Sequence, residues 1–211
     1  MTFPGIFSRL EVLGPSECAR IINCCTPHLE TSLVSKEGKK NEALRKSRSV
    51  LILPDDEKFS SIRLLMQRVV EAFVACSRTA FQYDMKAVEA IQFTEYKEGD
   101  YYNWHMDSSS TLPRTVSASL GLSSPMECQG GSLLFRDVYE DETEKDKVSI
   151  KLNQGEIAVF PSLLMHSVTP ILKGTRYSLV LWSPTPGLDD KQIQQPNQQP
   201  LADQTQDPIV F

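Results

Sequence analysis

The hydrophobic pattern of the chain changes near residue 88, and this change limits the possible folds more than any other feature of the sequence. From there on, short runs rich in β-branched and aromatic residues alternate with Gly, Pro, Asn, Asp and Ser. The runs are 88–96, 114–122, 131–135, 147–152, 156–160 and 175–183. Short β-rich runs with turn residues between them are typical of an all-β sandwich or barrel.

The residues before 86 follow a helical pattern instead. The segment 60–81 places seven apolar side chains on one wide face, which predicts an amphipathic helix. These side chains are Ile62, Leu65, Met66, Val69, Val70, Phe73 and Val74. The segment 14–29 predicts another helix, with Ser16 as its N-cap. A short strand is expected at 49–53, where Pro54 stops it.

Helices followed by a β-rich region indicate an α+β fold. With 211 residues, the chain suits one domain with its own hydrophobic core. The stretch 187–211 is rich in Gln, Pro and Asp and is expected to form an extended or disordered polar tail. Its apolar end, 209–211, is a candidate for docking back onto the body.

The charge balance argues against a nucleic-acid or membrane-surface protein. Twenty-two basic and 27 acidic residues give a formal net charge of −5, whereas such proteins usually present a basic face. No apolar run approaches the roughly 18 residues of a membrane span. The chain does not begin with a basic segment and a long apolar run, so no signal peptide is expected. The five cysteines lack a C-x-x-C pair, which predicts free thiols and a cytoplasmic protein.

The stretch NWHMD, residues 103–107, is the first candidate for chemistry. The chain has three histidines, and one of them, His105, stands two residues before Asp107. Side chains two residues apart on extended backbone return to the same face, so both can point at one object. Either the pair shares a metal ion, or it is an accident of a polar loop.

A second histidine, His166, follows an apolar strand further along the chain. Two histidines and one carboxylate form the ligand set of many non-heme Fe(II) sites, which leaves three open positions on one side of the metal. Zinc usually takes four ligands and has no redox chemistry, and no cysteine stands near these residues in the sequence. The third histidine, His28, has no comparable partner and is interpreted as structural.

Arg176 begins a strand whose two faces are both largely apolar, so the strand is expected to be buried on both sides. A buried arginine is costly unless it meets an anion, and the strand contains no acid. Pairing with an acid elsewhere in the core is one alternative. Arg176 and Ser178 share one face and could instead hold the carboxylate of a ligand through charge-assisted hydrogen bonds.

Several motifs follow one another in this part of the chain. YKEGDYYNWHMD (96–107) reads Y-x-x-G-x-x-Y-x-x-H-x-D, and GGSLLF (130–135) precedes GEIAVFPSLLMHSVTPILKGTRYSLVLW (155–182). Together they resemble the Fe(II)/2-oxoglutarate-dependent dioxygenases of the prolyl 4-hydroxylase-like superfamily. HSVTPILKGTR (166–176) is especially similar to the PKHD-type bacterial hydroxylases. The resemblance covers roughly residues 88–183 and extends more loosely to the N-terminal helices.

The resemblance implies an iron site of three residues: His105, Asp107 and His166. It implies that Arg176 pairs with the distal carboxylate of 2-oxoglutarate and that Ser178 supplies a hydroxyl beside it. Tyr96 matches a tyrosine that commonly lines the co-substrate pocket. Tyr102 stands where the family also tends to place an aromatic residue. From the residues alone, both tyrosines could equally be packing residues of the barrel.

The implied fold is a double-stranded β-helix, or jelly roll, with N-terminal supporting helices. One dioxygenase domain is expected over 1–186, with helical support at 1–85 and the catalytic β-helix core at 86–186. The implied cofactors are Fe(II), 2-oxoglutarate and O₂, with ascorbate as a further candidate. The implied reaction hydroxylates an unactivated C–H bond and releases succinate and CO₂.

The substrate is less constrained than the reaction. A prolyl or peptidyl substrate is favoured, and a free amino acid or another small molecule is an alternative, because a fold does not choose a substrate. The loop 108–114 and the acidic run 137–147 are expected to border the mouth, with Arg114 and Asn103 interpreted as solvated loop residues. A non-catalytic metal or 2-oxoglutarate sensor is the alternative from another class.

Two related chemistries are disfavoured. Halogenating relatives typically replace the carboxylate ligand by a small residue, whereas Asp107 is present here. AlkB-type nucleic-acid demethylases typically carry a second arginine six residues after the arginine that corresponds to Arg176. This chain has Trp182 at that position. No nucleic-acid or membrane partner is therefore expected, and the oligomeric state is left open.

Overall fold

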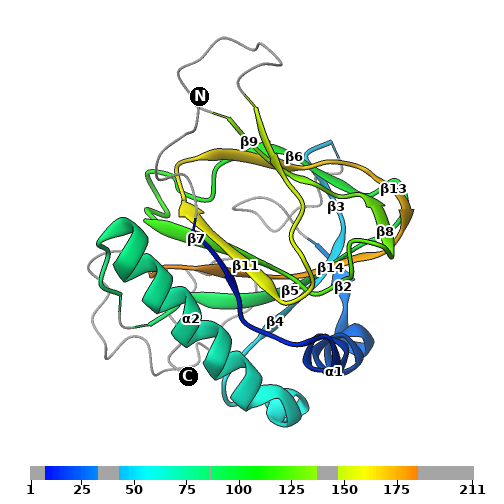
Figure 1. Ribbon diagram of the computed structural model, residues 1–211, viewed down its shortest axis with the longest axis horizontal. Helices are drawn as coiled ribbons and strands as arrows, with labels where there is room; N and C mark the ends of the chain where they lie inside the picture. The colour runs from blue at the N-terminus through cyan, green and yellow to red at the C-terminus, as the bar shows by residue number, and fades with distance from the viewer. Residues whose placement is uncertain (1–7, 33–42, 86, 137–146, 185–211) are drawn as a thin grey trace.

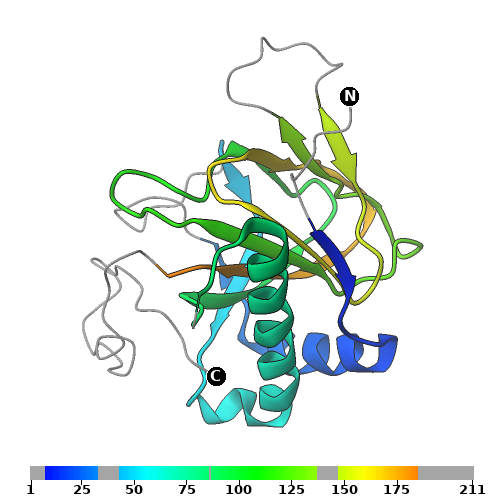
Figure 2. The same cartoon turned by 60° about the vertical axis from the view of Figure 1, so that its left-hand side comes forward.

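The computed structural model describes residues 8–32, 43–85, 87–136 and 147–184. Within them, two antiparallel β-sheets face each other, and two α-helices lie against the outer side of the larger sheet (Figure 1). A view turned by 60° shows the longer helix running across that outer side (Figure 2). This arrangement confirms the expected α+β fold with a jelly-roll core and supporting helices.

The large sheet has seven strands. In their order across the sheet they are β1 (Ser8–Glu11), β11 (Glu156–Pro161), β7 (Val116–Gly121), β14 (Arg176–Trp182), β5 (Ala90–Tyr96), β4 (Arg48–Ile52) and β2 (Glu30–Thr31). All the neighbouring pairs are antiparallel. The residues expected to form helical support thus also contribute strands, since β1, β2 and β4 extend this sheet.

The smaller sheet has five strands and carries most of the candidate metal ligands. In order they are β10 (Val148–Ile150), β9 (Leu133–Arg136), β12 (Met165–Val168), β6 (Tyr101–His105) and β3 (Arg45–Lys46). A separate two-stranded sheet is formed by β8 (Cys128–Gly130) and β13 (Ile171–Gly174). The β-rich runs of the sequence correspond to β5, β7, β9, β10, β11 and β14, whereas β6, β8, β12 and β13 were not predicted as strands.

Helix α1 (Pro15–Cys25) begins earlier than the sequence suggested. Its N-cap is Gly14, so the prediction of Ser16 as N-cap was wrong. Proline fits the first helical position, because the N–H that it lacks would have no partner there. The helix therefore includes Pro15, and the Glu17 carboxylate reaches back to accept a hydrogen bond from the Gly14 N–H at 2.8 Å.

Helix α2 (Arg63–Phe81) confirms the amphipathic helix expected at 60–81. Its first turn is replaced by a 3-10 helix over Glu57–Ile62, where the Asp56 side chain caps the Lys58 N–H. The buried face carries six of the seven predicted apolar side chains, with Ile62 at the end of the 3-10 turn: Ile62, Leu65, Met66, Val69, Val70 and Phe73. Val74 is only partly buried.

The structure contains two hydrophobic clusters, one on each face of the large sheet. The outer cluster joins the helices to the sheet and includes Cys18, Ile21, Met66, Val69, Phe73, Ile91, Phe93, Leu179 and Leu181. The inner cluster lies between the two sheets and includes Tyr96, Cys128, Leu133, Phe135, Ile150, Ala158, Phe160 and Val168. The large sheet therefore separates a helix-packed core from the barrel interior.

Several expectations concern segments outside the described residues. The polar tail at 187–211 and its apolar end at 209–211 lie outside the described residues, as does the acidic run 137–147 except for Lys147.

The five cysteines are free, as expected. Within the described part of the chain, neither helix has the length and apolarity needed to cross a membrane. The extent of the single domain stays a prediction.

Candidate functional site

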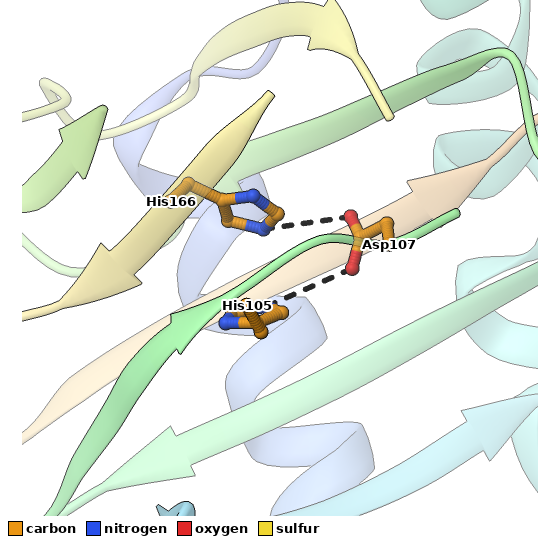
Figure 3. A group of neighbouring side chains, drawn as sticks. All are labelled: His105, Asp107 and His166. Atoms are coloured by element: carbon orange, nitrogen blue, oxygen red, sulfur yellow. Dashed lines mark ion pairs between the residues drawn. The ribbon is translucent and has the colours of Figure 1, made fainter. Parts of the chain in front are cut away.

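The two histidines of the candidate site face each other across neighbouring strands. β6 and β12 pair in antiparallel register with His105 opposite His166, and the centroids of the two rings are 4.1 Å apart. Asp107 follows the end of β6, where its N–H donates to the carbonyl of Ser162 at 2.9 Å. Figure 3 shows both rings pointing toward the Asp107 carboxylate.

A β-bulge in β6 controls which way its side chains point. His166 pairs with His105, but Val168 pairs with Tyr102, so β6 has one extra residue between the two pairs. The extra residue turns Tyr102 and His105 toward the same face, and their rings stack at a centroid distance of 3.5 Å and an angle of 12°. The bulge was not apparent in the sequence.

The imidazole nitrogens have distinct roles that follow from their hydrogen bonds. Nδ1 of His105 lies 2.8 Å from the carbonyl of Asn103, and Nδ1 of His166 lies 2.8 Å from the carbonyl of Leu164. A carbonyl can only accept, so each Nδ1 carries the proton in the neutral ring and each Nε2 carries a lone pair. These lone pairs face the Asp107 carboxylate. Nε2 of His105 lies 3.7 Å from Oδ1, and Nε2 of His166 lies 3.5 Å from Oδ2.

Burial acts on His105, and neighbouring charges act on Asp107, to favour the forms of these two residues that bind a metal ion. Burial and the neighbouring His166 imidazole lower the pKa of His105 to about 4, which leaves its ring neutral at neutral pH. Burial alone would raise the pKa of Asp107, but the two imidazoles and the Arg114 guanidinium outweigh it and lower that pKa. Neutral imidazoles and an ionised carboxylate are the forms that bind metals.

The donor atoms fit a divalent cation. The ligand atoms of His105, Asp107 and His166 all lie within 4.8 Å of one another. The Asp107 Oδ2 atom is buried and has no hydrogen-bond partner, and a buried carboxylate oxygen without a partner is costly unless a cation satisfies it. Among the described residues, no other group of His, Cys, Asp and Glu side chains has this geometry. Two imidazoles and one carboxylate suit Fe(II).

Arg176 lies on the inner face of the large sheet, deeper in the barrel. Its Nη1 donates to the Ser178 hydroxyl at 2.9 Å. Its guanidinium carbon lies 5.4 Å from the ring centroid of Tyr96, the residue opposite it on β5. Burial lowers the Arg176 pKa, and the described residues place no carboxylate within ion-pair distance of it. The core acid considered as an alternative partner is therefore absent from the described part of the chain.

Glycines make room for Arg176. Gly131 has φ +65°, and a Cβ there would approach the Arg176 Cδ to 2.9 Å and the Ile171 Cδ1 to 2.6 Å. At Gly130, with φ +78°, a Cβ would lie 2.1 Å from the carbonyl of Pro170. A cavity of about 30 Å³ lies beside Arg176, and Lys151 also lines it. The two glycines thus serve backbone geometry, and Gly131 also leaves room for the Arg176 side chain.

Tyr102 is held between the candidate metal ligand and a buried arginine. The Arg45 guanidinium carbon lies 4.8 Å from the Tyr102 ring centroid. Arg45 in turn donates to Ser47 at 2.7 Å and to Gln92 at 3.2 Å. Burial raises the pKa of the Tyr102 hydroxyl. Tyr102 therefore contacts the candidate metal ligand His105, on which its ring stacks, rather than Arg176.

A buried ion pair beside the site was not predicted from the sequence. Arg114 was interpreted as a solvated loop residue, which was wrong, because its side chain is 10% exposed and pairs with a Glu89 side chain that is 0% exposed. The only hint in the sequence is that Glu89 stands inside a β-rich run. Asn103, in contrast, is exposed as expected. His28 lies edge-on to Phe59 at 5.6 Å and joins no ligand group, in agreement with a structural role.

The fold and the site together define a jelly-roll protein with a two-histidine, one-carboxylate group inside the barrel. The family model of the 2OG-Fe(II) oxygenase superfamily matches residues 91–183. A PKHD-type hydroxylase of Prochlorococcus marinus is 31% identical over 166 residues, which cover 75% of this chain and 71% of that protein. A PKHD-type hydroxylase of Idiomarina loihiensis is 33% identical over 99 residues, 46% of this chain.

Solved structures show the same fold. A prolyl-4-hydroxylase of Pseudomonas putida superposes with a TM-score of 0.64 at 19% identity, over 86% of this chain and 93% of that chain. A prolyl hydroxylase from Trichoplax adhaerens, solved with a peptide fragment of the hypoxia inducible factor oxygen degradation domain, superposes with a TM-score of 0.69 at 18% identity, over 86% of this chain and 84% of that one.

The chain therefore belongs to the 2OG-Fe(II) oxygenase superfamily, in its prolyl 4-hydroxylase-like family. This confirms the resemblance read from the motifs. The matched segment spans 43% of the Idiomarina relative's own length and 40% of a Shewanella baltica relative's.

Proposed function

We propose that this protein is an Fe(II)- and 2-oxoglutarate-dependent dioxygenase that hydroxylates an unactivated C–H bond. His105, Asp107 and His166 would hold the Fe(II). The observation that carries the proposal is the convergence of two lone-pair Nε2 atoms on the Asp107 carboxylate, whose Oδ2 atom is buried and has no hydrogen-bond partner. Bound iron would supply the redox chemistry that uses O₂ to convert 2-oxoglutarate to succinate and CO₂ and to hydroxylate the substrate.

The second part of the proposal concerns Arg176. A guanidinium offers five donors, and only the bond to Ser178 uses one of them among the described residues. Arg176 and Ser178 would therefore hold the distal carboxylate of 2-oxoglutarate, with the Tyr96 ring as a wall of the pocket. This pairing would orient the other end of the molecule toward the metal ligands.

The chain's own residues perform three tasks in this proposal. The Nδ1 hydrogen bonds of His105 and His166 fix the ring orientations and keep each Nε2 free to bind. Tyr102 covers one face of the His105 ring and limits its movement and its access to water. The side chains of His105, Asp107 and His166 are at most 11% exposed, so little water reaches the reacting atoms.

For the substrate we propose a prolyl or peptidyl group. The support is indirect: the structural relatives include prolyl hydroxylases, and the Trichoplax protein was solved with a peptide fragment. A free amino acid or another small molecule is the second candidate. Ascorbate as a cofactor, a cytoplasmic location and the absence of nucleic-acid or membrane partners complete the proposal as expectations.

A sensor that binds metal and 2-oxoglutarate without oxidation is the competing function. It would keep the ligand triad, and its 2-oxoglutarate would be bound but not consumed. Both functions would use the triad and Arg176 to hold the two ends of 2-oxoglutarate, so the consumption of 2-oxoglutarate separates them.

Succinate formation separates these functions. Protein purified without oxygen and loaded with Fe(II) is mixed with 2-oxoglutarate and O₂, beside an Asp107→Ala variant. We expect slow succinate release from the wild type even without substrate, and none from the variant. Fe(II) binding without turnover would favour a sensor, and a wild type that binds no Fe(II) would overturn the proposal.

A further inference from the structure

Asp107 differs from the two histidines in how it is held. His105 and His166 lie within strands β6 and β12, where the ladder hydrogen bonds position them. Asp107 lies beyond the end of β6, so no ladder fixes it. Its N–H donates to Ser162 O at 2.9 Å, and its carbonyl accepts a long hydrogen bond from Nη1 of Arg114 at 3.5 Å. The orientation of this ligand therefore depends on contacts outside the sheets.

The Arg114 side chain is itself rigidly held. Its Nε donates to Glu89 Oε2 at 2.8 Å, and its Nη2 pairs with the other oxygen of the same carboxylate. Its guanidinium carbon lies 4.3 Å from the ring centroid of Trp182. The two Glu89 bonds use one edge of the guanidinium, and Nη1 on the other side is the donor turned toward Asp107.

The Glu89–Arg114 pair lies where three separate parts of the chain meet. Glu89 stands just before β5, and its N–H donates to the carbonyl of Trp182 at the end of β14. Arg114 stands just before β7, where the next residue, Thr115, accepts from the N–H of Ser162 at 3.0 Å. Ser162 is the same residue that accepts from Asp107. The segment from Asp107 to Thr115 is thus fixed at both of its ends.

We propose that Arg114, oriented by Glu89, is a positioning residue that sets the orientation of Asp107 for metal binding. The inference rests on the proposed function, since it assigns these residues a part in the same site. The Arg114 charge also lies close enough to Asp107 to lower the pKa of that carboxyl. Neither residue would touch the substrate or the metal.

A purely structural role would give a different response to substitution. Removing one partner of a buried ion pair leaves an uncompensated charge and is strongly destabilising, whereas replacing both partners by apolar residues of similar volume is often neutral. The double variant Glu89→Met/Arg114→Met should therefore recover most of the stability lost by Glu89→Met alone. It would still lack the donor to Asp107, so its metal affinity should stay low.

The chain offers a matched control in Glu95, on strand β5. Its side chain is 2% exposed, against 0% for Glu89, and it pairs with Arg48 at 2.5 Å. Its other contacts are the Tyr177 hydroxyl at 3.1 Å and the Lys97 Nζ at 3.8 Å. The double variant Glu95→Met/Arg48→Met removes a similar pair without touching a metal ligand.

The test measures Mn(II) binding to the metal-free protein by electron paramagnetic resonance, together with the thermal midpoint of unfolding. We expect the Glu89→Met/Arg114→Met protein to bind Mn(II) about 10- to 100-fold more weakly than the wild type, and the control pair to bind it normally. Arg114→Lys, which keeps the charge but not the two-pronged bond, is expected to fold and to lose part of the affinity, so it serves if the double variant fails to fold.

The possible failures can be told apart. If the wild type binds Mn(II) and both the double variant and Arg114→Lys bind it equally well, the positioning role is wrong and the proposed function stands. If the control pair weakens Mn(II) binding as much as the Glu89–Arg114 pair does, the effect is general loosening and the inference is also wrong. If the wild type itself binds no Mn(II), the metal site fails and the proposed function with it.

Discussion

The two faces of the large sheet bury different kinds of side chains. On the outer face, Leu179 and Leu181 of β14 join the apolar layer beneath the helices. On the inner face, the same strand carries Arg176 and Ser178, and neighbouring strands add the buried hydroxyl groups of Thr94 and Ser117. The outer face stabilises the fold mainly by excluding water, whereas the inner face buries polar groups beside the candidate site.

This difference has a physical cost. An apolar layer needs only complementary volume, so its side chains can be exchanged with modest losses. Buried polar groups must each find a partner, and those without one are destabilising until a ligand arrives. The Asp107 oxygen without a partner and the Arg176 guanidinium, which bonds to Ser178 alone among the described residues, are two such groups. We therefore expect substitutions on the two faces to separate stability from binding.

Substitution of Asp107 by Ala should have the largest effect on function. It removes one of the three proposed metal ligands, and we expect succinate formation to disappear and Mn(II) affinity to fall by at least about 100-fold. The stability of the metal-free protein should hold or rise, because the variant no longer buries a carboxylate oxygen without a partner. Urea unfolding of the metal-free protein checks the second part. A large loss of stability would contradict the assignment of Asp107 to binding.

Paired substitutions of two buried phenylalanines compare the faces directly. Phe73 belongs to the outer cluster and Phe135 to the inner one, and both are fully buried. Each change to Ala should lower the free energy of unfolding by about 3–5 kcal/mol. Only Phe135→Ala should also weaken Mn(II) binding, since its ring centroid lies 6.2 Å from that of His166. Equal Mn(II) affinity in the two variants would remove the distinction between the clusters.

Arg176→Lys should weaken 2-oxoglutarate binding and leave metal binding unchanged. Lysine keeps the charge but cannot form a two-pronged bond with a carboxylate. The loss of charge-assisted hydrogen bonds should weaken binding about 10- to 100-fold. Titration of the Mn(II)-loaded protein with 2-oxoglutarate measures this, with Val180→Ala on the same strand face as a control. An unchanged affinity would place the co-substrate carboxylate elsewhere.

The smallest expected effect concerns Gly131. Gly131→Ala should destabilise the protein by about 1–2 kcal/mol through its positive φ and should add a loss of 2-oxoglutarate affinity because the new Cβ presses on Arg176. Gly99→Ala is the matched control, since Gly99 has φ +77° but the nearest atom to its Cβ position is the Lys46 Nζ at 4.0 Å. The control should show the backbone cost and normal 2-oxoglutarate binding. If both variants bind 2-oxoglutarate normally, Gly131 serves only the backbone.

Much of the outer face could be predicted from local patterns. The period of apolar residues in α2 and the β-rich runs of β5, β7, β11 and β14 are properties of short windows, and burial on the helix side follows from them. Local patterns were less informative where special backbone geometry matters. The N-cap moved to Gly14 because proline fits the first helical turn, and β6 escaped prediction because its bulge breaks the alternation.

The candidate ligands were recognisable as residue types in a characteristic order, but their meeting was decided by the tertiary structure. His105 and His166 become neighbours only through the register of β6 against β12, and the histidine tautomers depend on carbonyls placed by that register. Arg114 showed the same limit more sharply, since it was interpreted as solvated and its buried partner Glu89 was not recognised.

The amino-acid sequence thus determined the fold class, the family and the side chains capable of metal chemistry. The tertiary structure decided which of them converge, which are buried and which are held by a partner. The physical reason is that periodicity is a property of neighbouring residues, whereas strand register, burial and the pairing of distant charges are properties of the whole packed chain.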